Sequence, residues 1–333
     1  MLRRCLGLVI LGMFAFALTP AWGQTPTYNK EAVRALSKRI DAHLAKTWKT
    51  AGVNPAPKAE DHVFFRRLNL DLAGRIPYFI TAQDFLENDS PDKRWDAVDR
   101  LLDTPQHHHH FANVWRGIML GYQTNQQFQF LMPQFETWLR ERIEKNVALD
   151  KTVYELLTSN QNNANMRFNG GNGQNFGNPQ LFFLANENKA ENLAAATSRV
   201  FLGVKIECAQ CHAHPFAKWS KDQFWEFAAF YSATQPNIPP VNGKGPKQPM
   251  PSFTPGREIL IPGTEKVVKA KYLNGKEPNW DNGGSPRKTL ADWVTAPENP
   301  YFAKAMADHL WSYLMGVSLL ERGFVALVMA SNF

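Results

Sequence analysis

The stretch that decides the fold of this chain is LAAATSRVFLGVKIECAQCHAHPFAKWSKDQFWEFAAFY, residues 193–231. On both sides of a short interruption, apolar residues recur every three or four positions, which is the period of an α-helix buried along one face. Ser220 and Gln223 have the spacing of a capping box at the start of the second helix. The two predicted apolar faces comprise Leu193, Ala196, Val200 and Val204, and Phe224, Phe227, Ala228 and Tyr231.

The interruption between these helices contains Cys208-Ala209-Gln210-Cys211-His212. C-x-x-C-H is the pattern through which c-type cytochromes hold haem covalently. The two thiols add to the two vinyl groups of one porphyrin, and a spacing of three brings both sulfurs to one side of a helical turn. The following histidine supplies the proximal nitrogen to the iron. The motif therefore predicts haem c on Cys208 and Cys211, with His212 as proximal ligand and the aromatic residues of the second helix as the walls of the site.

The same residues allow two other kinds of site. Zinc prefers thiolate and imidazole ligands, which Cys208, Cys211, His212 and His214 supply, but structural zinc sites usually take ligands from two separated segments. An exported chain can also form a Cys208–Cys211 disulfide. A thioredoxin-like dithiol is disfavoured, because its cysteines open a helix whose positive end lowers the pKa of the thiol. Haem attachment is the most specific of these interpretations.

The distal side of the iron has two candidate ligands, Met166 and Met250, and either thioether would raise the reduction potential. A five-coordinate iron is the alternative. His214 lies only two residues beyond the proximal ligand and cannot easily reach the opposite face of the iron. We expect it instead to support the proximal ligand through hydrogen bonds.

The N-terminus has the pattern of a secretory signal peptide over residues 1–23. Two arginines precede an apolar run at 6–18, which is too short to span a bilayer comfortably. Small residues favour cleavage before Gln24, so we predict a periplasmic or secreted protein without a stable membrane span after cleavage. Cys5 leaves with the peptide, and both remaining cysteines of the three in the chain belong to the motif. Export agrees with haem attachment, which takes place outside the bacterial inner membrane.

The rest of the chain predicts a mainly α protein. Helical periodicity covers residues 24–234, apart from a long Asn/Gly-rich loop at 160–179. Residues 235–285 form a Pro/Gly-rich linker with a short β-hairpin near 257–272, and residues 286–333 begin a second helical domain. A helix following Asn29 has an apolar face that we interpret as core packing, made of Val33, Leu36, Ile40, Leu44 and Trp48.

Two further features carry less information. The formal net charge is +7, but no block of lysine and arginine resembles a nucleic-acid footprint. The run His107–His110 has the composition of a metal-binding tract. Four adjacent residues of a helix point in different directions, however, so we interpret the run as the start of a helix.

Several longer motifs resemble a known family. They are FRRLNLDLAGRIP at 65–77, DKR at 92–94 leading to VDRLL at 98–102, TSRVFLGV at 197–204, ECAQCHAHPF at 207–216, PR at 286–287, LADW at 290–293 and PENPYF at 297–302. This set is similar to the planctomycete-type cytochrome-c-associated family, which joins two domains of unknown function. Ala213 departs from the family, which commonly has aspartate there. The chain ends soon after Trp311 and its last residues do not resemble the family's continuation, so we expect a truncated second domain.

Together these observations predict an exported c-type cytochrome-like protein that transfers electrons to or from a periplasmic redox partner. The alternative is a non-haem periplasmic scaffold that binds another protein or a polysaccharide, with a Cys208–Cys211 disulfide or a metal site. Neither a Ser/His/Asp arrangement, nor paired carboxylates, nor a nucleotide-binding loop is evident in the sequence. The sequence therefore assigns no enzyme class, no catalytic residue and no nucleic-acid partner.

Overall fold

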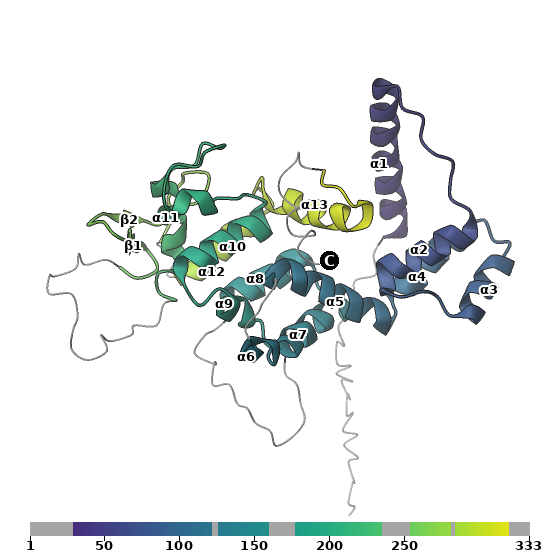
Figure 1. Cartoon of the computed structure of the whole chain (residues 1–333), viewed down its shortest axis with the longest axis horizontal. Helices are drawn as coiled ribbons and strands as arrows, with labels where there is room; N and C mark the ends of the chain where they lie inside the picture. The colour runs from purple at the N-terminus through teal and green to yellow at the C-terminus, as the bar shows by residue number, and fades with distance from the viewer. Residues whose placement is uncertain (1–28, 122–125, 160–176, 235–253, 281–283, 320–333) are drawn as a thin grey trace, which may run out of the picture. The chain divides into compact units, whose positions relative to one another are not determined.

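The computed structural model describes residues 29–121, 126–159, 177–234, 254–280 and 284–319. The described backbone is mainly helical and includes one two-stranded antiparallel sheet, which confirms the predicted fold class (Figure 1). The chain divides into two compact units, one up to Pro57 and one from Lys58 onward. The predicted signal peptide and most of the predicted Asn/Gly loop lie outside the described residues.

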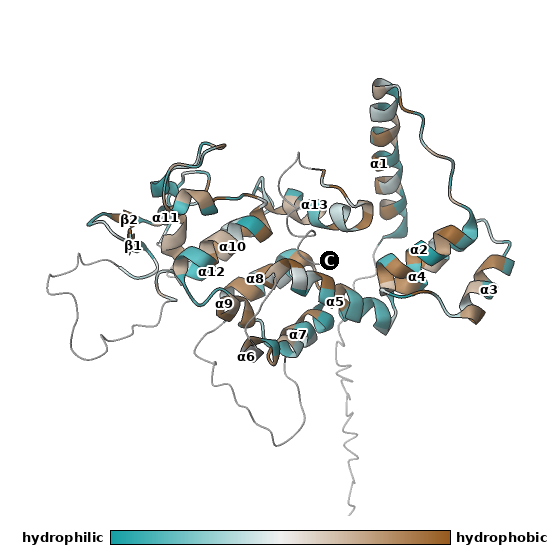
Figure 2. Cartoon of the chain, viewed as in Figure 1, coloured by the Kyte–Doolittle hydropathy of each residue, from teal (hydrophilic) through white to brown (hydrophobic). Residues whose placement is uncertain are grey.

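The first unit contains a single described helix, α1 (Lys30–Ala51). Its start is the predicted one, because the Asn29 side chain accepts a hydrogen bond of 3.0 Å from the backbone N–H of Ala32. Gly52 ends the helix in the left-handed conformation, at φ 66°. The interpretation of its apolar face as core packing is wrong for the described structure. None of its residues is buried, and Leu36 is 54% exposed. Among the described residues of this unit α1 is the only helix or strand, and Figure 2 shows that it carries both apolar and polar residues.

The second unit contains the remaining helices and both strands. Their bounds are α2 (Asp61–Ala73), α3 (Phe79–Glu87), α4 (Lys93–Leu102), α5 (Pro105–Leu120), α6 (Gln126–Gln129), α7 (Met132–Glu144), α8 (Leu149–Thr158), α9 (Leu181–Ala185), α10 (Ala190–Leu202), η2 (Glu207–Gln210), α11 (Lys221–Ala228), η3 (Ala229–Tyr231), β1 (Glu258–Leu260), β2 (Val267–Lys269), α12 (Pro286–Val294) and α13 (Phe302–Met315). The elements η2 and η3 are short 3₁₀ helices.

Helices α2, α3 and α4 share a small cluster of their own. The rings of Phe65 and Phe85 stack at 4.3 Å between centroids, beside buried Ala97. Asp61, in the first turn of α2, pairs with Lys93 and Arg94 of α4, each at 2.7 Å. Hydrogen bonds from Lys93 and then Arg94 lower the pKa of Asp61. The cluster therefore joins α2 to α4 by both apolar contact and charge.

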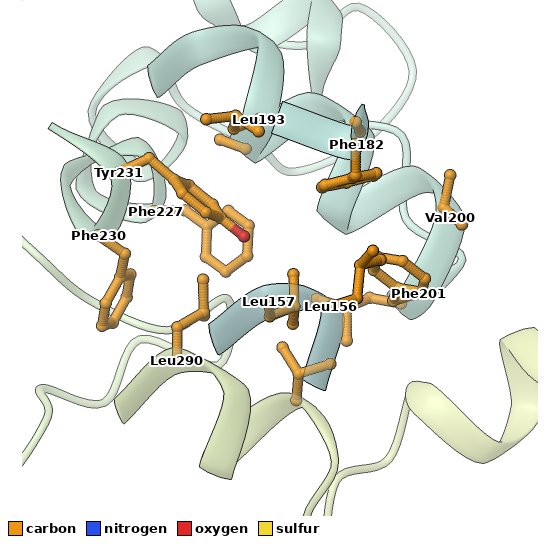
Figure 3. Packing of buried hydrophobic residues seen from close by; sticks show 14 of the residues in the cluster. Leu156, Leu157, Phe182, Leu193, Val200, Phe201, Phe227, Phe230, Tyr231 and Leu290 are labelled. Carbon is orange, nitrogen blue, oxygen red and sulfur yellow. The ribbon is translucent and has the colours of Figure 1, made fainter. Parts of the chain in front are cut away.

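The main core lies among α5, α7 to α13 and the hairpin. Figure 3 shows its centre, where side chains from α8, α9, α10, α11, η3 and α12 meet. Each fully buried Leu or Phe side chain adds about 1.5–3 kcal/mol to the free energy of unfolding, relative to the same side chain left exposed. The hairpin adds Ile259 and Val268, which are cross-strand partners, and the last helices add Leu290 and Phe302. The described parts of residues 235–285, predicted as a linker, and of residues 286–333, predicted as a second domain, thus supply side chains to the same core as α10.

One charged group, Arg287, enters this core. Its guanidinium donates hydrogen bonds to the carbonyls of Leu157 (3.4 Å) and Ser159 (2.8 Å), at the C-terminal end of α8. It also lies over the ring of Phe183, at 4.8 Å from the centroid. Burial lowers the pKa of Arg287. The carbonyls that end α8 are partly negative, so they take the place of a carboxylate partner.

Replacing Arg287 by methionine tests this arrangement. The change keeps most of the apolar stem but leaves the two carbonyls of α8 without their donor, so we expect a loss of about 2 kcal/mol in the free energy of unfolding. Arg257 is the matched control, because it lies over Trp280 at 4.8 Å but is exposed. Denaturant titration should find Arg257→Met close to the parent, and equal stability of both variants would contradict the assignment.

The histidine run lies at the start of α5, as predicted, where Thr104 accepts a hydrogen bond from the backbone N–H of His107. The side chains diverge. His107 donates from Nδ1 to the carbonyl of Leu72 at 2.9 Å, while His109 and His110 contact Arg140 and Tyr313. His107 is 7% exposed, and burial lowers its pKa. The run therefore helps attach α5 to α2.

A second buried histidine, His309 of α13, donates from Nε2 to the carbonyl of Val200 at 2.9 Å. Burial lowers its pKa, and the hydrogen bond and the charge of Asp308 oppose this only in part. The imidazole is neutral in both folded and unfolded chains above its ordinary pKa of 6.5. Below that pH the unfolded chain binds the proton more readily, so the free energy of unfolding falls as the pH decreases toward the lower pKa of the folded state.

We therefore expect His309→Gln to weaken the pH dependence of stability between about pH 7 and pH 5. Urea titrations at several pH values measure it. The parent chain, titrated under the same conditions, is the reference. A His309→Gln variant with the parental slope would show that this imidazole does not titrate with unfolding.

Candidate functional site

The C-x-x-C-H motif lies on the short helix η2 and the two residues after it, Cys211 and His212. Helix α10 ends at Leu202 because Gly203 adopts φ 66°, so Val204 lies beyond the helix and not on its face as predicted. Within η2, Ala209 is fully buried in the main core, whereas Cys208 and Cys211 are exposed and unbonded. Side chains three residues apart eclipse one another in a 3₁₀ helix. Cys208 lies in η2 and Cys211 directly follows it, and both thiols are accessible to solvent while Ala209 between them is buried.

Two contacts hold the motif to the neighbouring helices. The indole N–H of Trp225, on α11, donates to the carbonyl of Gln210 at 3.0 Å. Arg199, on α10, pairs with Glu207 at 2.6 Å. Neither Trp225 nor Arg199 was among the predicted site residues. The pairs are fifteen and eight residues apart, and no local spacing rule connects them.

The aromatic residues of α11 do not form the predicted wall. Phe224 is 1% exposed, and Phe227 and Tyr231 are fully buried. They lie within the core that supports the motif, so the outer surface at the cysteines is open among the described residues. The aromatic pattern was correctly assigned to a buried face, and that burial is the reason why these rings cannot also flank a group on the surface.

His212 is exposed and its ring is oriented by a local hydrogen bond. Its Nδ1 lies 2.7 Å from the carbonyl oxygen of Ala213. A carbonyl only accepts, so Nδ1 carries the proton and the neutral ring keeps the lone pair on Nε2. This is the arrangement that fixes the tautomer of metal-ligating histidines. His212 can therefore offer Nε2 to an iron on the side of the exposed thiols.

His214 has the opposite arrangement. Its Nδ1 accepts a hydrogen bond of 3.1 Å from the backbone N–H of Phe216, so the proton of the neutral ring lies on Nε2. Its own backbone N–H donates to the carbonyl of Trp219 at 2.8 Å. Neither nitrogen of His214 then has a lone pair free for a metal ion. These contacts fix the loop that follows His212.

The C-x-x-C-H motif is followed by an exposed loop. Phe216 is 94% exposed, in a loop whose residues from Cys211 to Lys218 are exposed apart from His214. Met166 and Met250, the predicted distal ligands, lie outside the described residues. The two pockets described among the resolved elements are lined by residues of α2 and α5, and of α12 and the segment after β2, so neither adjoins the cysteines.

Comparison with known proteins identifies the family. The model of a family of proteins of unknown function, PSCyt2 (DUF1549), matches residues 39–236. The chain belongs to this family. The match includes α2 to α11 and the C-x-x-C-H motif. No curated protein and no solved structure matches the chain. In the part of the PSCyt2 chain that the structure describes, no helix has the length and apolar character needed to cross a membrane.

The buried position of Ala209 generates a prediction about the motif. A larger side chain there must displace the core, so Ala209→Leu should lower the free energy of unfolding by about 1–3 kcal/mol. Ala213→Leu adds the same side chain at an exposed position of the adjacent loop and should have little effect. Denaturant titration of both variants measures the difference. Equal stabilities would mean that η2 is not anchored through Ala209.

Proposed function

We propose that this PSCyt2 protein is an exported c-type cytochrome-like protein, with haem bound through thioethers to Cys208 and Cys211. The observation that carries the proposal is the arrangement of the motif. Both thiols are exposed on a turn whose middle residue, Ala209, is fixed in the core. A porphyrin is far too large for that core, so attachment requires the thiols to project outward from a backbone that does not move. The donor set and its placement fit covalent haem.

His212 is the proximal ligand in this proposal. Its Nδ1–H bond to the carbonyl of Ala213 leaves Nε2 as the nitrogen for the iron. Its position directly after Cys211 is the one that the proximal ligand occupies in the C-x-x-C-H pattern. His214 supports the loop and does not ligate, because its Nδ1 already accepts from Phe216. Met166 or Met250 remains the proposed distal ligand.

Bound haem would supply one-electron transfer, and the chain's residues would hold it and expose its edge. Trp225 and the Arg199–Glu207 pair fix the turn that carries the thiols. A rigid attachment limits the reorganisation that accompanies a change of charge on the iron. The open surface around the cysteines and the exposed Phe216 suit brief contact with a periplasmic redox partner. The periplasmic location follows from the signal-peptide pattern of residues 1–23 and is part of the proposal.

The alternative function is a non-haem scaffold. Cys208 and Cys211 are both exposed and three residues apart, and in this alternative they would form a disulfide. A four-ligand zinc site has less support, because His214 uses its Nδ1 lone pair within the loop.

We further propose that residues from Pro286 onward correspond to the start of the family's usual partner domain.

The deciding experiment is expression of the full chain, with its leader, alongside the cytochrome c maturation machinery. We expect haem staining on a denaturing gel and a mass increased by one haem, both lost in the Cys208→Ala/Cys211→Ala variant. A matured protein with the mass of its amino acids alone would overturn the proposal.

The two histidines provide a matched pair of variants. We expect His212→Ala to change the absorption spectrum of the iron or to lower the yield of haem protein. His214→Ala should keep covalent haem with the parental spectrum, because its contacts are within the loop. Identical spectra for both variants would contradict the assignment of His212 as the proximal ligand.

A further inference from the structure

A pocket of about 390 Å³ lies between α12 and the segment that follows β2, away from the cysteine motif. Its lining includes two aromatic residues, Tyr272 and Trp293, and four polar ones, Asn279, Lys288, Thr289 and Asp292. This volume and this mixture of aromatic surface with a few polar groups are typical of small-molecule sites. The proposed haem function does not use any of these residues.

The aromatic part of the pocket is rigid. The rings of Tyr272 and Trp293 stack with centroids 4.8 Å apart and an interplanar angle of 12°. On its other side Tyr272 stacks on the buried Phe230, at 5.3 Å and 16°. The Tyr272 hydroxyl donates to the carbonyl of Thr289 at 3.4 Å. Trp293 also meets the buried Phe227 at 6.5 Å and 67°, so its ring is held by the core from two sides. The part of Trp293 that lines the pocket can contact the apolar face of a ligand.

The polar part of the pocket is charge-balanced. Lys288 and Asp292 are one helical turn apart on α12 and pair at 3.0 Å, with about half of each side chain exposed. The ammonium supplies donors, the carboxylate supplies acceptors, and the Asn279 amide supplies both. Because the two charges compensate each other, the pocket favours neither a cation nor an anion. It suits a neutral ligand with several hydroxyl groups.

We infer that this pocket binds a neutral saccharide unit, such as a pyranose of an oligosaccharide or polysaccharide. A pyranose combines the two properties that the lining requires, since its C–H face is apolar and its rim carries hydroxyl groups that both donate and accept. The C–H face stacks on Trp293 and the hydroxyls bond to Asn279, Asp292 and Lys288. An aromatic ligand would leave the polar rim unpaired, which is costly once it is covered.

The test is titration of the full mature chain with neutral oligosaccharides built from glucose, N-acetylglucosamine, xylose or galactose, followed by calorimetry and tryptophan fluorescence. We expect saturable binding of at least one of them. Choline and a sulfated oligosaccharide serve as charged comparisons and should not compete. The haem content of the sample is measured separately, so failure of this inference is distinguishable from failure of the proposed function.

Asp292→Ala removes a rim group at an exposed position and should weaken binding about tenfold. Asp222→Ala is its matched control, because Asp222 forms an exposed ion pair with Lys266 at 2.6 Å and does not line the pocket. Trp293→Leu should abolish binding, with its folding checked by circular dichroism. Absence of binding by every neutral saccharide, preference for a charged ligand, or equal effects of the two aspartate variants would each overturn the inference.

Discussion

The burial of Ala209 is the constraint on which the candidate site depends. This side chain lies in the core that α10, α11 and η3 share, whereas Cys208 before it and Cys211 two residues after it are exposed. The short 3₁₀ helix η2 holds Ala209 inward and begins the turn that carries both cysteines. The direction in which the cysteines point is therefore a consequence of core packing. Any change that moves α11 also moves the carbonyl of Gln210, to which Trp225 is bonded.

The same core depends on contacts between distant parts of the chain. Arg287 reaches from α12 to the end of α8, and Thr197 of α10 is bonded to the Tyr231 hydroxyl at 2.7 Å. Burial raises the pKa of Tyr231, so the phenol stays neutral and this bond persists over the physiological pH range. Tyr231, Thr197 and Arg287 each have a defined partner, and the core accepts them because an unpaired buried polar group would cost more than the pairing contributes.

Local chemistry explains what the sequence could predict. Asn29 and the Ser220–Gln223 capping box are local signals, and the structure contains both where predicted. The predicted hairpin near 257–272 also rests on a local pattern, and β1 and β2 form it. In contrast, the contacts of Trp225 with Gln210 and of Arg287 with α8 join residues that no periodicity relates. The orientations of the rings of His212 and His214 depend on single backbone groups, which a sequence pattern does not specify.

The two amphipathic helices α1 and α10 show the limit of such patterns most directly. Both carry apolar residues every three or four positions, yet nine residues of α10 are buried and none of α1 is. The periodicity of a sequence indicates that one face of a helix is apolar, but it does not show whether another element covers that face. Helix α10 is covered because α11, η3 and α13 pack against it. Among the described residues of its own unit, α1 has its caps, its backbone hydrogen bonds and side-chain hydrogen bonds within the helix, such as that from Thr47 to the carbonyl of His43. Isolated helices are marginally stable in water. The stability of a helix in this chain therefore follows from its neighbours and not from its pattern.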